Sequence, residues 1–244
     1  MIDIKGIYKR FNNNIVLNGI DIQIPENQIL TIIGPNGSGK TTLIKSILGM
    51  LIIDKGDVLI NGTSITDSPE YRNKISYLPQ AASFPSNLKV VELLKMIKNL
   101  RDRTVEYHPL LEHFNLHQYL NKKISSLSQG TRQKINLVIA FMFNAPILIL
   151  DEPTAGLDPI SVIKVKELIQ LEKSKGKTIL VTSHIMSFIE EISDKIIFLL
   201  DGKVYFNGTV SKLKSKIKRN RTSKEKYLTD FEFAITTILE EKNV

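Results

Sequence analysis

The stretch Gly34–Thr41 reads GPNGSGKT, which fits the pattern of a glycine, four residues, a second glycine, a lysine and a Ser or Thr. The run before it, Gln28–Ile33, predicts a strand, and Thr42–Leu48 after it predicts a helix. In that context the pattern is typical of a loop that binds phosphate, because its glycines let several backbone N–H groups turn toward one anion. We therefore predict that this loop binds a nucleoside triphosphate.

Two side chains in this stretch suit particular parts of such a ligand. Lys40 supplies a full positive charge for the β- and γ-phosphates, and the Thr41 hydroxyl suits Mg²⁺. The helix that begins here also points its positive end at the anion. A glycine-rich turn in front of an amphipathic helix is the alternative interpretation, and the complete pattern makes it the weaker one.

A second half of the site is predicted far downstream. The apolar run Ile147–Leu150 ends in Asp151 and Glu152, which is typical of a buried parallel strand with two acids at its carboxyl end. Ligands of open α/β sheets bind at that edge. Asp151 would hold Mg²⁺ through its water shell, and Glu152 would polarise an attacking water. Two solvated acids at a strand end would be the preferred interpretation if the phosphate-binding loop were absent.

Composition favours a globular protein that is soluble. The chain has 244 residues, 42% apolar and 24% charged, with no cysteine for disulfides or thiolate metal sites. Its longest unbroken apolar run, Leu137–Phe143, is far shorter than the roughly 20 residues of a membrane span. The first residues, Met1–Arg10, read as a strand with interspersed charges, so no signal peptide is expected.

The order of predicted elements indicates an α/β core interrupted by helices. Between about Val90 and Phe143 the apolar residues recur with helical spacing. A helix is expected over Lys40–Met50, and strands are expected at Ile15–Ile24, Gln28–Ile33, Asp57–Ile60, Ile75–Leu78, Ile147–Asp151, Thr178–Thr182, Lys195–Leu200 and, after a turn at Asp201-Gly202, Lys203–Asn207. A nucleotide-binding core with a helical lobe accounts for this order.

The C-terminal region differs in character. Lys212–Lys226 carries eight Lys or Arg residues and one Glu, within a net charge of +8 for the chain. A solvated linker is the favoured interpretation, contact with anionic headgroups remains open, and no nucleic acid is expected because no stacking aromatics accompany the charge. Thr229–Glu232 then predicts a capping box before a helix with Phe231, Ala234, Ile235 and Ile238 on one face.

Two histidines stand four residues apart in the helical lobe. His113 and His117, with Glu112 adjacent, would share one helix face. A metal site is the weaker interpretation because the sequence offers no evident third ligand, and a solvated face is favoured.

The stretch Leu127–Thr131 reads LSQGT and resembles LSGGQ, the signature of ATP-binding cassette (ABC) ATPases. It starts 24 residues before Asp151, where that family places it. Other family motifs follow in order: Gln80 of the glutamine loop, Glu152-Pro153-Thr154, the D-loop Ala155–Asp158 and the switch histidine His184. The resemblance covers about residues 2–210.

This resemblance implies a P-loop NTPase (RecA-like) α/β fold with an antiparallel β-subdomain and an inserted helical subdomain. The ATPase domain would span residues 1–210, with the helical subdomain at about 81–145. Residues 211–244 would form a basic linker and a C-terminal helix.

The resemblance also implies the cofactors ATP and Mg²⁺ and a set of site residues. Glu152, His184 and Gln80 would be catalytic, and Thr41, Gln80 and Asp151 would hold the metal. Taken alone, Gln80, His184 and Ser128 have structural interpretations, and only the order of the motifs favours function. The residues expected at the nucleotide are Phe11 against adenine (with Tyr8 as the substitute), Gly34, Pro35, Asn36, Gly37, Ser38, Gly39, Lys40, Thr41 and Thr42, and, against the ATP of an opposite subunit, Ser128 and Gly130.

The signature departs from the family pattern at two positions. Gln129 replaces a glycine and Thr131 replaces a glutamine. If the backbone at Gln129 needed a positive φ, the side chain would carry strain there, and we expect such strain to slow hydrolysis more than it would disturb the fold.

As a member of this family the chain would be the ATP-binding subunit of a transporter. It would act on the inner face of the cell membrane as a peripheral cytoplasmic protein, paired head to tail with a second ATPase subunit. A separate transmembrane permease would dock near Gln80, where Ala81–Leu88 offers Phe84 as an exposed or buried aromatic. The stretches LSQGT and Tyr77–Leu88 resemble those of exporter cassettes. Among these cassettes, the resemblance is to the ATPase of the gene cluster that matures the copper site of nitrous-oxide reductase. The alternatives are a soluble cassette ATPase acting on ribosomes or DNA, and a regulatory module without turnover.

Overall fold

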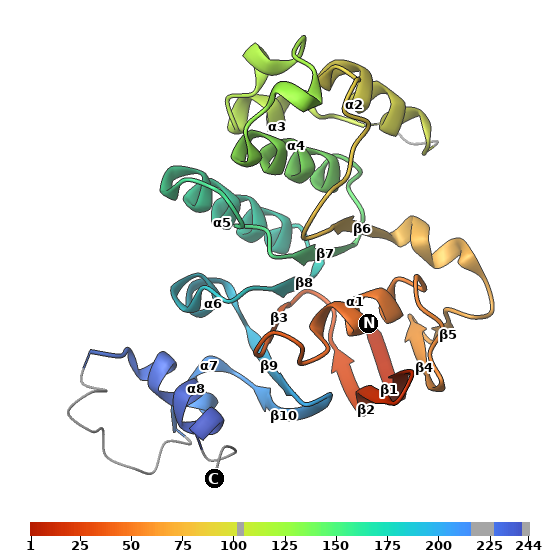
Figure 1. Ribbon diagram of the computed structural model, residues 1–244, viewed down its shortest axis with the longest axis vertical. Coiled ribbons are helices and arrows are strands. Elements are labelled where there is room, and N and C mark those ends of the chain that lie inside the picture. Colours follow the sequence, from red (N-terminus) through yellow and green to blue (C-terminus); the bar gives the residue numbers. More distant parts are fainter. Residues whose placement is uncertain (102–104, 216–226, 241–244) are drawn as a thin grey trace.

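Two β-sheets and the helices around them make up the structure (Figure 1), a computed structural model that describes residues 1–101, 105–215 and 227–240. The six-stranded sheet has the order β10-β9-β3-β8-β7-β6, in which β10 is antiparallel to β9 and the other neighbours are parallel. Its strands are β3 (Ile29–Ile33), β6 (Ile75–Leu78), β7 (Ile147–Asp151), β8 (Thr178–Thr182), β9 (Lys195–Leu200) and β10 (Lys203–Gly208).

The four-stranded sheet is antiparallel with the order β2-β1-β4-β5. Its strands are β1 (Ile2–Phe11), β2 (Asn14–Ile24), β4 (Lys55–Ile60) and β5 (Thr63–Ser64). Helix α1 (Lys40–Ile47) lies between the two sheets, and its Leu43, Ile44 and Ile47 are buried with apolar residues of both. The four-stranded sheet and α1 together cover one face of the six-stranded sheet.

Alternation along β7 shows how the six-stranded sheet is covered on both faces. Ile147 and Ile149 pack with α1 and the antiparallel sheet, whereas Leu148 and Leu150 pack with helices of the opposite face. Those helices are α5 (Pro159–Ser174), α6 (Met186–Ile192) and α4 (Gln129–Phe141). Every residue of β3, β7 and β8 is buried, which explains why these strands are predominantly apolar.

The remaining helices lie at the two ends of the molecule in Figure 1. The helical lobe between β6 and β7 contains α2 (Val90–Asn99), α3 (His108–His113) and α4, with short 3₁₀ turns η2 (His117–Tyr119) and η3 (Ile124–Ser126). Another 3₁₀ turn, η1 (Pro69–Lys74), precedes β6, and the chain continues after β10 into α7 (Val210–Ser215) and α8 (Asp230–Glu240). Within the described ranges, no helix combines the length and apolar character that a membrane span requires.

The helix predicted over Lys40–Met50 ends earlier, at Ile47. Gly49 has a φ of 60° and donates its N–H to Ser46 O at 3.1 Å, while the Met50 N–H donates to Lys45 O at 2.9 Å. This pair of hydrogen bonds is a Schellman ending, which a left-handed glycine permits.

The idea that His113 and His117 share a helix face is wrong. Helix α3 ends at His113, Asn115 takes a φ of 55°, and His117 begins the separate turn η2. His113 Nε2 instead lies 3.0 Å from Lys164 O. Among the residues described, no group of three or more His, Asp or Glu side chains is arranged to hold a metal ion.

The C-terminal helix forms with the predicted cap. Thr229 N–H donates to Glu232 Oε2 at 2.8 Å, and Glu232 N–H donates to Thr229 Oγ1 at 3.2 Å. The capping box of α8 is therefore confirmed. Most of the basic run Lys212–Lys226 lies outside the described residues.

Candidate active site

The phosphate loop, Gly34–Thr41, connects β3 to the first turn of α1. A Cβ atom at Gly34 would lie 2.1 Å from Leu199 O, and one at Gly39 would lie 2.8 Å from Val16 O, so a larger residue would displace backbone at either position. Because Gly39 is the N-cap of α1, no side chain of its own caps the first turn. The N–H groups of that turn suit phosphate oxygens.

Ser38 contributes an unpaired donor to the same loop. Its side chain is buried, and its Oγ has no hydrogen-bond partner among the described residues. Buried polar groups normally have partners, so an unpaired hydroxyl inside this glycine-rich turn is a place for a ligand atom. The loop therefore fits an anion by its backbone and by this side chain.

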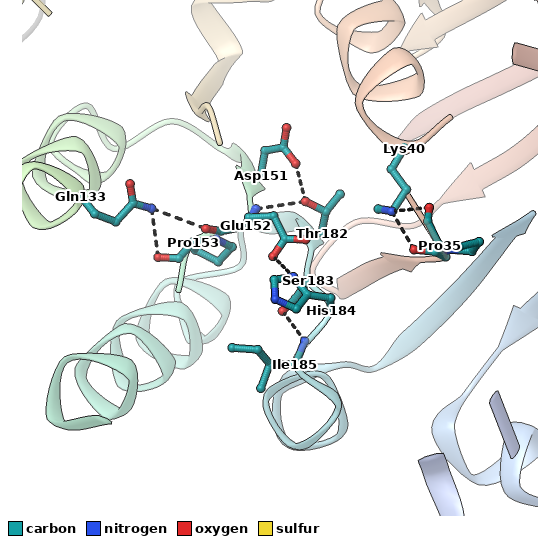
Figure 2. A network of polar contacts seen from close by, with 11 residues as sticks. Pro35, Lys40, Gln133, Asp151, Glu152, Pro153, Thr182, Ser183, His184 and Ile185 are labelled. Carbon is teal, nitrogen blue, oxygen red and sulfur yellow. Dashed lines mark hydrogen bonds and ion pairs between the residues drawn. The ribbon is translucent and has the colours of Figure 1, made fainter. Parts of the chain in front are cut away.

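Lys40 folds back over the phosphate loop (Figure 2). Its Nζ donates to Gly34 O at 2.7 Å and to Pro35 O at 3.0 Å. Burial lowers the pKa of Lys40, and the nearby carboxylates of Glu152 and Asp151 act in the opposite direction. Two neutral carbonyls are the direct partners of this cation, so an incoming phosphate would offer it a stronger one.

Asp151 lies at the end of β7, opposite Thr182 at the end of β8. The Thr182 hydroxyl donates to Asp151 Oδ1 at 2.5 Å and accepts from the Glu152 N–H at 3.0 Å. Burial raises the pKa of Asp151, and the Thr182 hydrogen bond and the Lys40 charge partly offset that effect. The sequence prediction did not include Thr182, although a polar residue ending the strand next to an acidic strand could have indicated it.

Glu152 adopts an unusual backbone conformation, with a φ of 51°. A non-glycine residue in this region costs of order 1–3 kcal/mol, and such residues cluster at functional sites. Its Oε2 lies 2.9 Å from His184 Nδ1, a close polar contact whose geometry falls short of a hydrogen bond. The Glu152 side chain is 9% exposed, whereas that of His184 is 73% exposed.

Gln133 of α4 supports this turn from behind and was also missed. It is buried, and its Nε2 donates to Pro153 O at 3.2 Å and approaches Glu152 O at 3.5 Å. A glutamine that interrupts the buried face of a helix is the signal that could have identified it. The amide ties the helical lobe to the strained turn after β7 (Figure 2).

One cavity of about 460 Å³, here called the catalytic cavity, brings most of these groups together. Gln80, Glu152 and His184, all predicted to be catalytic, line it with Gly34, Pro35 and Asn36 of the phosphate loop, and the rest of its lining is Ile33, Ser183, Met186, Phe198, Ile235 and Leu239. Residues from six separate parts of the sequence thus meet at one end of the parallel sheet. The participation of Ile235 and Leu239 was not predicted.

Other predicted nucleotide residues lie outside this lining. Phe11 ends β1 with 46% of its surface exposed, and Lys9 Nζ lies 5.3 Å from its ring centroid. Tyr8 is 41% exposed. Thr41 and Thr42 follow Lys40 in the first turn of α1. The exposed ring of Phe11 could stack on a base.

The signature residues lie at the start of α4, away from the catalytic cavity of the same chain. Ser128 is exposed and caps the helix by accepting from the Thr131 N–H at 3.2 Å. A Cβ atom at Gly130 would lie 2.9 Å from Gly156 O, so the helix start packs closely on the D-loop.

Gln129 carries no left-handed strain. It is the first residue of α4 and is not among the non-glycine residues with positive φ. Its side chain lies against Gly156. The condition for strain at this glutamine, a positive φ, is therefore not met.

Comparisons with known proteins agree with one another. A family model described as "ABC transporter" matches residues 17–155. The Bacillus subtilis protein named "Uncharacterized ABC transporter ATP-binding protein YhaQ" is 36% identical over 228 residues, covering 91% of this chain and 76% of its own length.

Two solved structures are similar throughout the cassette. One, titled "Structure of ATP binding subunit of ABC transporter", is 30% identical with a TM-score of 0.83 and covers 88% of this chain and 92% of that one. The other, "Dimeric Structure of MJ0796, a Bacterial ABC Transporter Cassette", is 25% identical with a TM-score of 0.78 and covers 86% and 98% of the two chains.

Proposed function

The chain belongs to the ABC transporter family of ATP-binding proteins, and from this we propose that it hydrolyses ATP at the catalytic cavity while paired with a second cassette. The comparisons confirm the predicted family, the α/β cassette fold and the ATPase class. The proposal concerns the roles of individual residues, the partners and the domain limits: an ATPase domain at residues 1–210 with a helical subdomain at about 81–145, followed by a basic linker and helix at 211–244.

The observation that carries the proposal is the shared lining of one cavity. Glu152, His184 and Gln80 face the same space as the start of the phosphate loop. In our proposal Glu152 orients the attacking water and accepts its proton, and His184 donates to the γ-phosphate. Gln80 fixes the water or a metal ligand with its amide. Lys40 leaves the carbonyls of Gly34 and Pro35 to neutralise the β- and γ-phosphates.

The residues at this edge of the sheet fit a hard divalent cation. Asp151 is a buried carboxylate with one oxygen bonded by Thr182, and the exposed Thr41 hydroxyl lies at the start of α1. We propose that Thr41, Gln80 and Asp151 hold Mg²⁺, since it prefers oxygen ligands. When bound, the ion would neutralise phosphate charge.

We propose that the second cassette is another copy of this chain. Ser128 and Gly130 lie outside the catalytic cavity of their own chain, so a head-to-tail pair would bring each signature to the other's ATP. The helix start at α4, with its capped N-terminus, is suited to a γ-phosphate oxygen. The relative MJ0796 is titled as dimeric, which supports this arrangement.

Phosphate release from the purified full-length chain tests this function. Wild type with Mg²⁺ and ATP should turn over, and its specific rate should rise with protein concentration because two chains form each site. Glu152→Gln should lower kcat by about 10²-fold or more, as expected for loss of a catalytic base. The exposed control Glu112→Gln should match wild type. Equal rates for both variants would contradict the assignment of Glu152.

We propose that a membrane subunit docks in a groove of about 490 Å³ beside the start of the helical lobe. Leu48, Gly49, Met50, Arg72, Ile75, Tyr77 and Arg101 line it. Met50 is 64% exposed at its edge, and Ile52 nearby in sequence is 86% exposed. A groove lined by apolar side chains together with two arginines suits a short amphipathic helix of a partner. From the sequence alone, Phe84 is either an exposed docking aromatic or a buried one. Phe84 is partly buried against the core of the helical lobe, which favours the second interpretation.

Recovery of a membrane protein tests the groove. Tagged wild-type chain, extracted with detergent from its native membranes, should bring a polytopic protein with it, as a subunit at the inner face of the membrane would. Met50→Asp should lose that protein, whereas Ile163→Asp on α5, which is also exposed, should keep it. Retention of the membrane protein by Met50→Asp would rule out the groove.

We propose export as the direction of transport only from the exporter-like stretches LSQGT and Tyr77–Leu88. The resemblance to the ATPase of nitrous-oxide reductase maturation stays a prediction.

A further inference from the structure

Helix α8 is anchored firmly beside the catalytic cavity. Phe231, Ala234 and Ile235 are buried in a cluster with residues of β3, β9, β10, α6 and α7, including Ile33, Ile189, Phe198, Phe206 and Leu213. The capping box at Thr229 and Glu232 fixes the start of the helix. In Figure 1 α8 lies next to α6 and β9, although a long stretch of chain separates them.

One edge of α8 reaches the catalytic cavity. Ile235 and Leu239, one helical turn apart, line that cavity together with Asn36, Glu152 and His184. Ile238 also packs against the buried cluster that contains Phe231, and it is half-buried like Leu239. It is not part of the cavity lining. The helix therefore presents one apolar edge to the reacting groups and another to the supporting core.

Met186 connects this edge to the switch histidine. It begins α6 two residues after His184, lines the catalytic cavity, and packs against the cluster that contains α8. The short segment between β8 and α6 is thus fixed at one end by Thr182 and at the other by Met186. His184 itself is mostly exposed, so the ends of this segment determine where its imidazole lies.

We propose that α8 is a functional part of the hydrolysis site, in which Ile235 and Leu239 act as positioning residues for His184. This inference rests on the proposed catalytic roles of Glu152 and His184. Loss of the apolar edge would let Met186 move, and the imidazole would leave its place beside Glu152. Small displacements of catalytic groups lower turnover strongly while substrate binding to the rest of the site continues.

The test compares Leu239→Ala, Ile238→Ala and Leu239→Met in the full-length chain by ATP turnover and thermal melting. Leu239→Ala should lower kcat by about fivefold or more with the KM for ATP within about twofold, since positioning affects the chemical step. Ile238→Ala should lower the Tm similarly and keep kcat, and Leu239→Met should restore kcat because it conserves volume. In a His184→Ala background, Leu239→Ala should have no further effect on kcat.

The possible outcomes separate this inference from the function on which it rests. Equal kcat losses for Leu239→Ala and Ile238→Ala, unchanged kcat in both, or faster turnover by Leu239→Ala would overturn the positioning role. No turnover by wild type, or normal turnover by His184→Ala, would instead overturn the proposed catalytic roles and this inference with them.

Discussion

His184 Nδ1 lies 2.9 Å from Glu152 Oε2, and the two residues follow the ends of the neighbouring strands β8 and β7. The contact places the group proposed to meet the γ-phosphate directly against the group proposed to orient water. The left-handed backbone of Glu152, with a φ of 51°, directs its side chain into the catalytic cavity. The side chains proposed to bind the γ-phosphate and the attacking water, His184 and Glu152, are therefore in contact with each other.

Replacing Lys40 should lower the affinity for nucleotide. Lys40→Ala deletes the cation above the phosphate loop, and hydrogen bonds to charged groups contribute about 1.5–3 kcal/mol each. We expect ATP affinity to fall by about tenfold or more in isothermal titration calorimetry. Lys95→Ala, which alters an exposed lysine on α2, should bind as wild type does. An unchanged affinity for Lys40→Ala would contradict the role of this loop.

Thr182 should matter for both stability and turnover. Thr182→Val removes the donor to Asp151 Oδ1 and leaves that buried carboxylate oxygen without this partner, at a cost of about 1–3 kcal/mol. The Glu152 N–H loses the Thr182 hydroxyl but keeps the Thr182 carbonyl at 3.2 Å. Urea unfolding should show that loss, and kcat should fall with it. Thr178→Val at the other end of β8 loses only a 3.3 Å contact from the Asn27 N–H and should keep kcat. Equal activities of the two variants would argue against Thr182 as a support of the site.

Asp151 should make stability without nucleotide depend on pH. Burial raises its pKa above 3.8, so the folded state favours the protonated form and loses stability as pH rises through that raised pKa. Asp151→Asn removes the buried charge, and its Tm should exceed that of wild type at pH 7.

The gain should disappear where Asp151 is protonated in both states, below about pH 3.8, if both proteins are still folded there. Melting curves from pH 4 to pH 8 should show the difference shrinking toward the acidic end, while the same variant hydrolyses ATP poorly at pH 7. A gain that stays constant with pH would show that the charge of Asp151 is not its cause.

Restoring the family's glycine in the signature should not accelerate the enzyme. Gln129 lies in the first turn of α4 without a positive φ, so Gln129→Gly relieves no backbone strain. Glycine inside a helix costs about 1 kcal/mol relative to good helix formers. We expect kcat within about twofold of wild type and a slightly lower Tm. An increase of tenfold in kcat would show that the glutamine does restrain the signature.

The sequence predicts the position of those candidate residues whose pattern is local. Lys40 and Asp151 belong to patterns in which a strand, a loop and a helix follow directly, so their places at the sheet edge follow from the order of residues alone. Thr182 and Gln133 carry weak local signals, a threonine at a strand end and a glutamine on the buried face of a helix, but their importance depends on which strand and which helix lie beside the acidic turn. The same holds for α8: its capping box is local, but its docking on β9 and α6 depends on tertiary packing across residues far apart in the chain.

The histidine pair shows the opposite error. The spacing of His113 and His117 suits one helix, but Asn115 takes a left-handed conformation between them and ends that helix. Asparagine tolerates such a φ better than most residues, so Asn115 was the sequence signal that the helix ends between the two histidines.

Size-exclusion chromatography of Glu152→Gln with and without Mg²⁺ and ATP tests the central claim, that the catalytic cavity is completed by a second chain. Because this variant should bind ATP without hydrolysing it, nucleotide should convert the monomer into a stable dimer, and Ser128→Arg, which blocks the signature, should prevent the conversion. A Glu152→Gln chain that binds ATP in calorimetry yet elutes as a monomer at every ATP concentration would contradict the account.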